Sequence, residues 1–309
     1  MKKRTKLLAL VLSVVTMSSM LFGCGSSAAP KKNIVVGEGT TETGESQTEE
    51  TAGSSTDAEQ TSSDVSIEEQ VLLDQDGIKI TATEYVTDSI MGDGIKLLVE
   101  NNSDTDYTIG CDELIVNDYM IADLFSVDVA AGKKSNEMMY LSSSELKAAG
   151  IDTVGKVEMY FHAYDANWDD LFQNVYSEIE TSEFANMDTT PNDEGTELYN
   201  ENGIRIVGKT VDENSFWGTA ILLYIENTSG KNVGISVDNM SINGFMMTPY
   251  FSTTVYDGKK VIDDITIMSS DLEENGIESI DEVELKFHIY DEDSYDTIAD
   301  SDAITFSAK

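Results

Sequence analysis

The last two thirds of the chain contain the same sequence twice, and this duplication most constrains the fold. A shift of 126 residues places the Phe-His-Ala-Tyr-Asp run at Phe161 on the Phe-His-Ile-Tyr-Asp run at Phe287. Over residues 70–170 the two copies share 33 of 101 positions without a gap. A unit of about 110 residues has the size of an ordinary domain. The sequence therefore predicts two domains of one fold, repeat 1 (70–182) and repeat 2 (196–309), joined by a linker (183–195).

Alternating side chains within each copy predict β-strands. Apolar residues occupy every second position over residues 157–164, and the same alternation returns over residues 283–290. A period of two with one apolar face indicates a half-buried strand. Asn243-Gly244 is typical of a two-residue hairpin turn, and repeat 1 has Asn117-Asp118 in the same place. The strands are therefore expected to pair antiparallel.

One short helix is predicted in each copy. Ser144 and Ser270 have the chemistry of N-caps, and Gly150 and Gly276 suit the left-handed residue that ends a helix. Seven or eight short strands and one helical turn fit about 110 residues of an antiparallel sandwich. The predicted fold class is all-β, with two tandem immunoglobulin-like antiparallel β-sandwiches.

The first 24 residues predict export and lipid anchoring. Four basic residues within the first six precede an apolar run, which ends in Leu21-Phe22-Gly23-Cys24. This order resembles the bacterial lipoprotein signal. The resemblance implies a signal peptide over residues 1–23, fatty acylation of Cys24 with chains such as palmitate, and a place on the extracytoplasmic face of the cell membrane.

Residues 24–69 are predicted to be a disordered acidic linker. They contain no aromatic residue, and residues 33–69 contain ten acidic residues and no basic one. Such a segment buries too little apolar surface to offset the entropy lost on ordering. We expect it to hold both domains away from the membrane.

Charge and cysteine content restrict the possible partners. The chain has 58 acidic and 19 basic residues, a net charge of −39. Nucleic acid and anionic lipid head groups would be repelled, whereas cationic partners and divalent metal ions would be attracted. Besides Cys24 the only cysteine is Cys111, which is interpreted as a buried apolar residue. An exported chain without an internal disulfide favours a Gram-positive-type envelope.

Two acidic turns are candidate calcium sites. Their oxygen ligands would be Asp165, Asn167 and Asp169 in repeat 1, and Asp291, Asp293 and Asp296 in repeat 2. Alternating Asp and Asn oxygens are ligands that calcium prefers. However, an EF-hand needs glycine at the sixth position, where these turns have Asp170 and Asp296. The alternative is that these side chains cap the backbone of ordinary turns. No cofactor other than this calcium is predicted.

Aromatic side chains in or near these loops are candidate ligand-binding residues. Trp168, Tyr295 and Trp217 would stack on sugar rings if they are exposed, and would close the ends of the sandwich if they are buried. Each repeat has a single histidine, His162 or His288, and nothing nominates catalytic partners for either. No phosphate loop, zinc cluster or nucleophile elbow is present, so the chain is not predicted to be an enzyme.

Three motifs carry a resemblance to a known family. They are Glu-Asn-x-Ser at 100–103 and 226–229, Asn-Gly-Phe-Met at 243–246, and the Phe-His-x-Tyr-Asp strand end. The pattern resembles the immunoglobulin-like domains of unknown function that occur, singly or in tandem, in lipoproteins of Firmicutes bacteria. The resemblance implies the fold and brings no activity with it.

Taken together, these patterns predict a lipid-anchored cell-surface binding module that interacts with another protein of the envelope. A calcium- or glycan-binding module is the alternative, and a solute-binding lipoprotein is a third. Loops that differ between the copies, 87–93 and 213–219, are expected to determine specificity.

Overall fold

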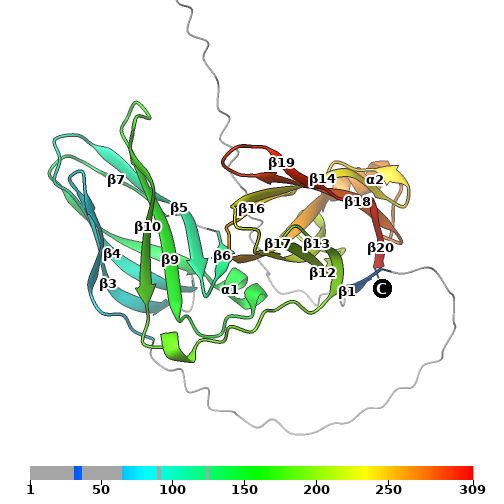
Figure 1. The fold of residues 1–309 in the computed structure, drawn as a ribbon, viewed down its shortest axis with the longest axis horizontal. Coiled ribbons are helices and arrows are strands. Elements are labelled where there is room, and N and C mark those ends of the chain that lie inside the picture. Colours follow the sequence, from blue (N-terminus) through cyan, green and yellow to red (C-terminus); the bar gives the residue numbers. More distant parts are fainter. Residues whose placement is uncertain (1–30, 37–64, 89–91, 123–124, 309) are drawn as a thin grey trace, which may run out of the picture.

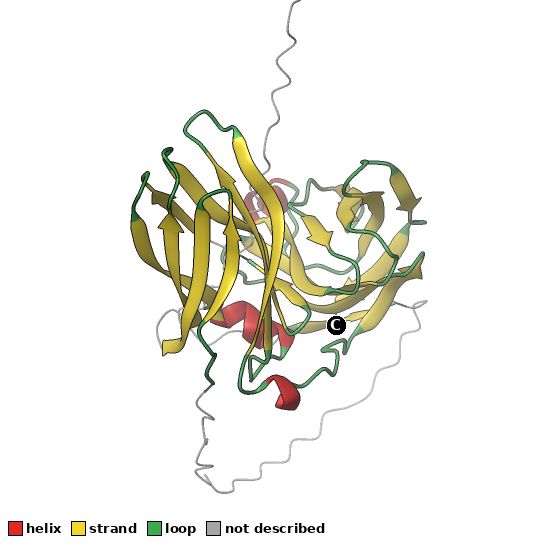
Figure 2. Cartoon of the chain, turned by 60° about the vertical axis from the view of Figure 1, so that its left-hand side comes forward, coloured by secondary structure: helices red, strands yellow, loops and turns green. Residues whose placement is uncertain are grey.

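The computed structural model describes residues 31–36, 65–88, 92–122 and 125–308, and strands make up most of them (Figures 1 and 2). The signal sequence, Cys24 and much of the predicted linker lie outside the described residues. Repeat 1 contains β2 (Gln70–Gln75), β3 (Ile78–Asp88), β4 (Gly92–Asn101), β5 (Tyr107–Val116), β6 (Tyr119–Ile121), β7 (Ser126–Val129), β8 (Lys134–Ser142), α1 (Ser143–Ala149), β9 (Lys156–Tyr164) and β10 (Asp170–Glu180).

Repeat 2 follows a short 3₁₀ helix, η1 (Phe184–Asn186), and has the same element order, except that two strands take the place of β10. It contains β11 (Thr196–Glu201), β12 (Ile204–Asp212), β13 (Gly218–Asn227), β14 (Val233–Ile242), β15 (Phe245–Met246), β16 (Ser252–Val255), β17 (Lys260–Met268), α2 (Ser269–Glu274), β18 (Val283–Asp291), β19 (Thr297–Asp300) and β20 (Ile304–Ala308). One further strand, β1 (Lys32–Val35), comes from the N-terminal region.

Each repeat is an immunoglobulin-like sandwich of two antiparallel sheets. In repeat 1 the sheet β2-β3-β4-β8 packs on β10-β9-β5, to which β6 and β7 also pair. In repeat 2 the sheet β11-β12-β13-β17 packs on β14 and β18 with their shorter neighbours. Phe161 and Phe287, which the duplication relates, are fully buried between the two layers. The predicted all-β fold is confirmed.

The local signals of the sequence are largely confirmed. Asn243 and Gly244 both have positive φ, as a tight hairpin turn requires. Gly150 adopts the left-handed conformation, and the Ile151 N–H donates to the Leu146 carbonyl at 2.8 Å. The N-cap prediction was wrong, because α1 begins at Ser143 and its N-cap residue makes no side-chain cap.

The predicted linker contains a strand that completes repeat 2. β1 pairs antiparallel with β12 and with β20, and so joins the two sheets of the sandwich along one edge. Ile34 is 3% exposed in the core, and its carbonyl accepts a hydrogen bond from Thr196 Oγ1 at 2.5 Å. The prediction of a disordered linker over all of residues 24–69 was therefore wrong. The short β-branched run at Ile34 and Val35 forms a strand, and Ile34 packs into the core of repeat 2.

Part of the linker between the repeats binds both of them. The Asn192 backbone N–H donates to Tyr119 Oη at 2.9 Å, and Asn192 Nδ2 donates to the Ala148 carbonyl at 2.8 Å. Lys209 Nζ, on β12, donates to the Asn192 carbonyl at 2.6 Å. The repeats also meet where β6 pairs in parallel with β17, so the chain is more than two independent domains on a string (Figure 1).

Candidate functional site

A row of aromatic side chains lies along the outer face of β9 in repeat 1. Tyr160, His162 and Tyr164 share this face because successive side chains of a strand alternate. His162 stacks on Tyr164 with ring centres 5.7 Å apart, and Tyr164 stacks on Trp168 at 4.8 Å and an interplanar angle of 17°. Trp168 is 75% exposed. The row thus ends in an open indole face.

Repeat 2 contains the same arrangement. His288 stacks on Tyr290 at 5.7 Å, and Tyr290 stacks on Tyr295 at 6.1 Å and 23°. Tyr295 is 74% exposed. Each repeat therefore has a stack of three rings, which we call the aromatic stack: His162, Tyr164 and Trp168, or His288, Tyr290 and Tyr295. The predicted ligand-binding residues Trp168 and Tyr295 are the outermost ring of each stack.

The outermost rings are held in an unfavourable backbone conformation. Trp168 has φ of 65° and Tyr295 has φ of 59°. Large side chains rarely adopt this left-handed region, and such strain is concentrated at functional sites. Both repeats thus have an aromatic residue in this conformation at the outer end of the stack.

The repeats reach this common geometry through turns of different length. The hydrogen bond that closes the turn joins the Asp165 N–H to the Asp169 carbonyl in repeat 1, and the Asp291 N–H to the Asp296 carbonyl in repeat 2. Repeat 2 therefore has one additional residue. An ungapped shift of 126 pairs Tyr295 with Asp169 and hides the equivalence of the outermost rings.

A glycine on the neighbouring strand lets each stack lie flat. A Cβ atom added at Gly110 would lie 2.4 Å from His162 Nε2, and one at Gly234 would lie 2.1 Å from the ring of Tyr290. Any larger residue would lift a ring of the stack. Carboxylates orient the histidines, because Asp112 Oδ1 lies 2.6 Å from His162 Nδ1 and Asp300 Oδ1 lies 2.6 Å from His288 Nδ1.

The carboxylate of repeat 1 that was predicted to bind calcium caps its own turn. Asp165 Oδ1 accepts the backbone N–H of Asn167 at 2.8 Å and that of Asp169 at 3.0 Å. The hydrogen bond from the Asp169 backbone, followed by that from Asn167, holds the pKa of Asp165 below its usual value.

Repeat 2 uses its acidic turn in the same way. Asp291 Oδ1 accepts the N–H groups of Asp293 and Ser294, while Asp291 Oδ2 pairs with Lys231 Nζ at 2.5 Å. The hydrogen bond from Lys231 is the main reason that the pKa of Asp291 is low. Within the residues that the structure describes, no three His, Cys, Asp or Glu side chains converge on a metal position. These contacts support turn capping for both acidic loops.

A cavity of 460 Å³ lies between the repeats at the inner end of the repeat 1 row. Tyr160 and Tyr256 meet edge to face in its wall, with ring centres 5.1 Å apart. Its lining contains three acidic residues and no basic residue: Glu113, Tyr160, Asn174, Asn232, Thr254, Tyr256, Glu292 and Asp293. The cavity therefore attracts positive charge.

Glu292 gives this cavity an unusual acidic group. Its Oε2 atom is buried and has no hydrogen-bond partner among the described residues. Burial raises the pKa of the Glu292 carboxyl, the Thr254 side chain opposes this shift, and the charges of Asp293 and Asp291 add to it. A bound cation would satisfy this oxygen and favour the ionised form.

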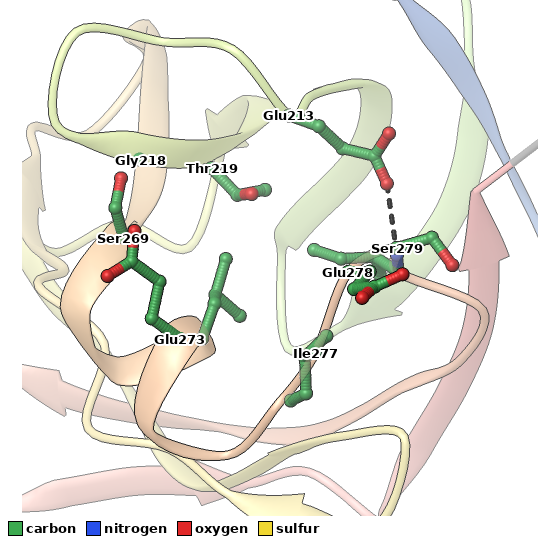
Figure 3. A pocket seen from close by; sticks show the side chains of 10 residues that line it. Glu213, Gly218, Thr219, Ser269, Glu273, Ile277, Glu278 and Ser279 are labelled. Atoms are coloured by element: carbon green, nitrogen blue, oxygen red, sulfur yellow. Dashed lines mark hydrogen bonds between the residues drawn. The ribbon is translucent and has the colours of Figure 1, made fainter.

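Trp217 does not belong to either aromatic stack. It is 53% exposed and lies beside Phe216 in the β12–β13 loop, next to the start of α2 at the opposite end of β18 from Tyr295. A smaller cavity of 180 Å³ lies nearby, and Glu213 is part of its wall. The Glu213 carboxylate accepts the Ile280 N–H at 3.0 Å, the hydrogen bond that is dashed in Figure 3. Loop 213–219, predicted to determine specificity, borders this cavity, whereas loop 87–93 lies partly outside the described residues.

The sequence analysis did not identify Tyr164 and Tyr290, which lie between the histidine and the outermost ring of each stack. It also did not identify the cavity between the repeats. The alternation along β9 and β18 contained the signal for the tyrosines, because residues 162 and 164 and their copies share a face. The cavity has no signal in the sequence, since it depends on how two domains pack. Cys111 is buried, as predicted, and its thiol donates a hydrogen bond to the Glu113 carbonyl at 3.0 Å.

We find no known family whose model matches the chain, and no curated protein matches it. A solved structure of the Salmonella enterica SafA pilin in complex with the SafB chaperone is similar over 74% of this chain and 95% of that chain, at 11% identity and a TM-score of 0.24. A likeness this low carries no argument about function. Among the described residues, none of the helices has the length and apolar character needed to cross a membrane.

Proposed function

We propose that this chain is a non-catalytic binding module of the bacterial cell envelope, whose partner is an extended protein segment carrying basic residues. The observation that supports this most is the aromatic row on β9. It leads from the exposed ring of Trp168 to the acidic cavity between the repeats. Exposed aromatic faces bind cations and flat groups, and carboxylates then fix the charged ends.

Charge supports a cationic partner over an anionic one. The net charge of −39 and the carboxylates of Glu113, Glu292 and Asp293 would repel phosphate-rich ligands. The unpartnered Glu292 oxygen would gain a hydrogen bond from a lysine or arginine head group. Attraction over the whole surface would also speed association at low salt.

Anchoring through Cys24 belongs to the same proposal, together with the resemblance to Firmicutes lipoprotein domains. Cys24→Ser should release the chain from the membrane fraction and abolish incorporation of labelled palmitate. Retention of the variant in the membrane fraction would contradict the lipid anchor and leave the binding proposal to be judged by its own test.

The binding proposal is tested with short synthetic peptides of matched hydropathy and graded net charge. Binding to the mature chain should rise with positive charge and weaken roughly tenfold on Trp168→Ala. Glu292→Gln should reduce the preference for positive charge. The matched control is Val71→Ala, because Val71 is also apolar and exposed but lies outside the row. Binding that ignores peptide charge, or that Trp168→Ala leaves unchanged, would overturn the proposal.

A neutral glycan is the second candidate, favoured by the flat and open face of Trp168. Sugar rings stack on such faces. Oligomers of N-acetylglucosamine should then change the tryptophan fluorescence, and Trp168→Ala should remove the change while Trp217→Ala retains it. If the fluorescence does not respond, the glycan candidate is excluded.

A further inference from the structure

The contact between the repeats uses a hairpin of repeat 1 and a strand edge of repeat 2. β6 pairs in parallel with β17, with Tyr119 opposite Lys260 and Met120 opposite Val261. Tyr119 is 5% exposed, packs edge to face on Tyr224 at 6.4 Å, and lies under the Lys260 ammonium group. The hairpin thus buries its apolar side chains on the neighbouring repeat.

Buried ion pairs accompany this contact. Lys259 Nζ lies 2.5 Å from Glu158 Oε2 and 3.1 Å from Asp118 Oδ1, so a cation of repeat 2 pairs with two anions of repeat 1. Lys156 completes the cluster from repeat 1. The contact therefore consists of the apolar hairpin residues Tyr119 and Met120 and an ion pair between Lys259 of repeat 2 and Glu158 of repeat 1.

Repeat 2 has the same hairpin in the same position. Asn243 Oδ1 accepts the N–H groups of residues 281 and 282, as Asn117 Oδ1 accepts those of residues 155 and 156. The equivalents of Tyr119 and Met120 are Phe245 and Met246. These two side chains are 46% and 65% exposed. The hairpin that repeat 1 buries is thus present and uncovered in repeat 2.

Repeat 1 in turn has the receiving edge uncovered. β8 is the equivalent of β17, and among the described strands it pairs only with β4. Lys133 and Lys134, the equivalents of Lys259 and Lys260, are exposed. Beside the uncovered hairpin, Glu284 is the equivalent of Glu158, and Glu282 replaces Lys156. The two lysines of the edge therefore complement the two glutamates beside the hairpin in charge, while the equivalent of Asp118 is Gly244.

We propose that the β15 hairpin of one molecule docks on the β8 edge of a second copy of this chain, and so repeats the internal contact between molecules. The proposal goes beyond the binding function above, because it uses a different surface. Phe245 lies opposite Lys134, and Met246 lies opposite Ser135. Lys133 pairs with Glu284. Since the two surfaces differ, this contact is head-to-tail and generates a row of molecules.

The contact between copies is weaker than the contact within the chain. Tyr224 and Ile262 of the internal edge are replaced by Leu98 and Asn136 on repeat 1. The smaller and more polar surface buries less apolar area. Confinement on one membrane by lipid anchors would raise the effective concentration of the partners.

Disulfide cross-linking tests the docking in the mature chain. All variants carry Cys24→Ser and Cys111→Val, which remove the natural thiols; valine is the residue that repeat 2 has in place of Cys111. Ser135→Cys with Met246→Cys places thiols on neighbouring strands, within disulfide range. Oxidation should produce linked dimers and higher multimers on non-reducing gels, with yields that rise with protein concentration.

Matched variants make the result decisive. Met120→Cys with Val261→Cys should form the equivalent disulfide within one chain, which confirms that the register permits it. Val71→Cys with Met246→Cys gives the background of chance collisions between exposed sites. The proposal is overturned if the internal pair forms while the Ser135–Met246 pair stays at this background, or if Met246→Cys alone forms dimers equally well.

A charge swap distinguishes docking from loss of structure. Lys133→Glu should lower the multimer yield several-fold by placing like charges together, and adding Glu284→Lys should restore it. Both residues are exposed, so circular dichroism melts should not change. A yield unaffected by Lys133→Glu, or one that the second change does not restore, would contradict the proposed register.

Discussion

In repeat 1, residues 65–69 precede β2 and lie beside the segment that follows β10, where the Ser182 N–H donates to the Ser66 carbonyl at 2.8 Å. In repeat 2 the equivalent residues, 191–195, lie against repeat 1, and β1 makes the crossing instead. The slot for β1 differs accordingly, because Gly208 leaves room for Ile34 where repeat 1 has Ala82. The two copies thus share the sandwich, but residues 191–195, which would form the edge segment of repeat 2, contact repeat 1 instead.

The largest loss of stability is expected from substitutions at a position that both repeats share. Asn101 and Asn227 are fully buried, and each Nδ2 donates to two backbone carbonyls. Asn101→Asp or Asn227→Asp keeps the acceptor and removes both donors, which should cost about 3 kcal/mol of unfolding free energy. Denaturant unfolding followed by hydrogen exchange should locate each loss in its own repeat. A loss confined to one of the two variants would show that the shared motif has different roles.

Ile34→Ala should destabilise repeat 2 and leave repeat 1 unchanged. Removal of a buried isoleucine side chain costs about 2 kcal/mol or more, and here the cost should fall on repeat 2 alone. Hydrogen exchange should rise in β12 and β20 and stay constant in β3 and β10. The control Val36→Ala changes an exposed neighbour and should have no effect. Unchanged exchange in β20 would argue against the pairing of β1.

The stability of repeat 2 should depend on pH in a way that repeat 1 does not share, because of Asp263 on β17. Burial, with the nearby charges of Asp264 and Glu145, raises its pKa to about 7. The folded state therefore holds this proton more tightly than the unfolded chain, and stability is lost as pH rises from about 4 toward 7. Asp263→Asn should raise the melting temperature more at pH 8 than at pH 4.5. Glu137→Gln, at the equivalent place in repeat 1, is the control; an equal shift in both variants would exclude the burial effect.

The smallest effects on stability should come from the aromatic stacks. Trp168→Gly and Tyr295→Gly remove exposed rings and relieve a positive φ, so the unfolding free energy should stay within about 1 kcal/mol of wild type or increase. Thermal melts would check this result. A clear destabilisation of either variant would make the ring a structural plug and would remove the support for a binding role.

The sequence predicted features that depend on near neighbours. The strands around Phe161 and Phe287, the turn at Asn243 and the helix end at Gly150 all follow from local patterns. The motif around Asn101 was recognised, but its role required the positions of carbonyls on other segments.

Features that depend on distant partners could not be predicted. Lys32 pairs with Val211, and no pattern near Ile34 indicates so remote a partner. The only signal was a short β-branched run in an otherwise polar segment. The equivalence of Tyr295 and Trp168 was hidden by one inserted residue, and the cavity at Glu292 arises from domain packing.

The position of β1 has a consequence for the order in which the two repeats can fold. Val35 lies in the first of the described strands, whereas its partner Ser307 lies in the last of them. Repeat 1 has all its strands within one continuous stretch and can therefore fold while synthesis continues. Repeat 2 must wait for β20, and until then the parts of β1 and β18 that pair with it stay unpaired. The first of the described strands is thus the one that closes repeat 2, and it begins only eight positions after Cys24.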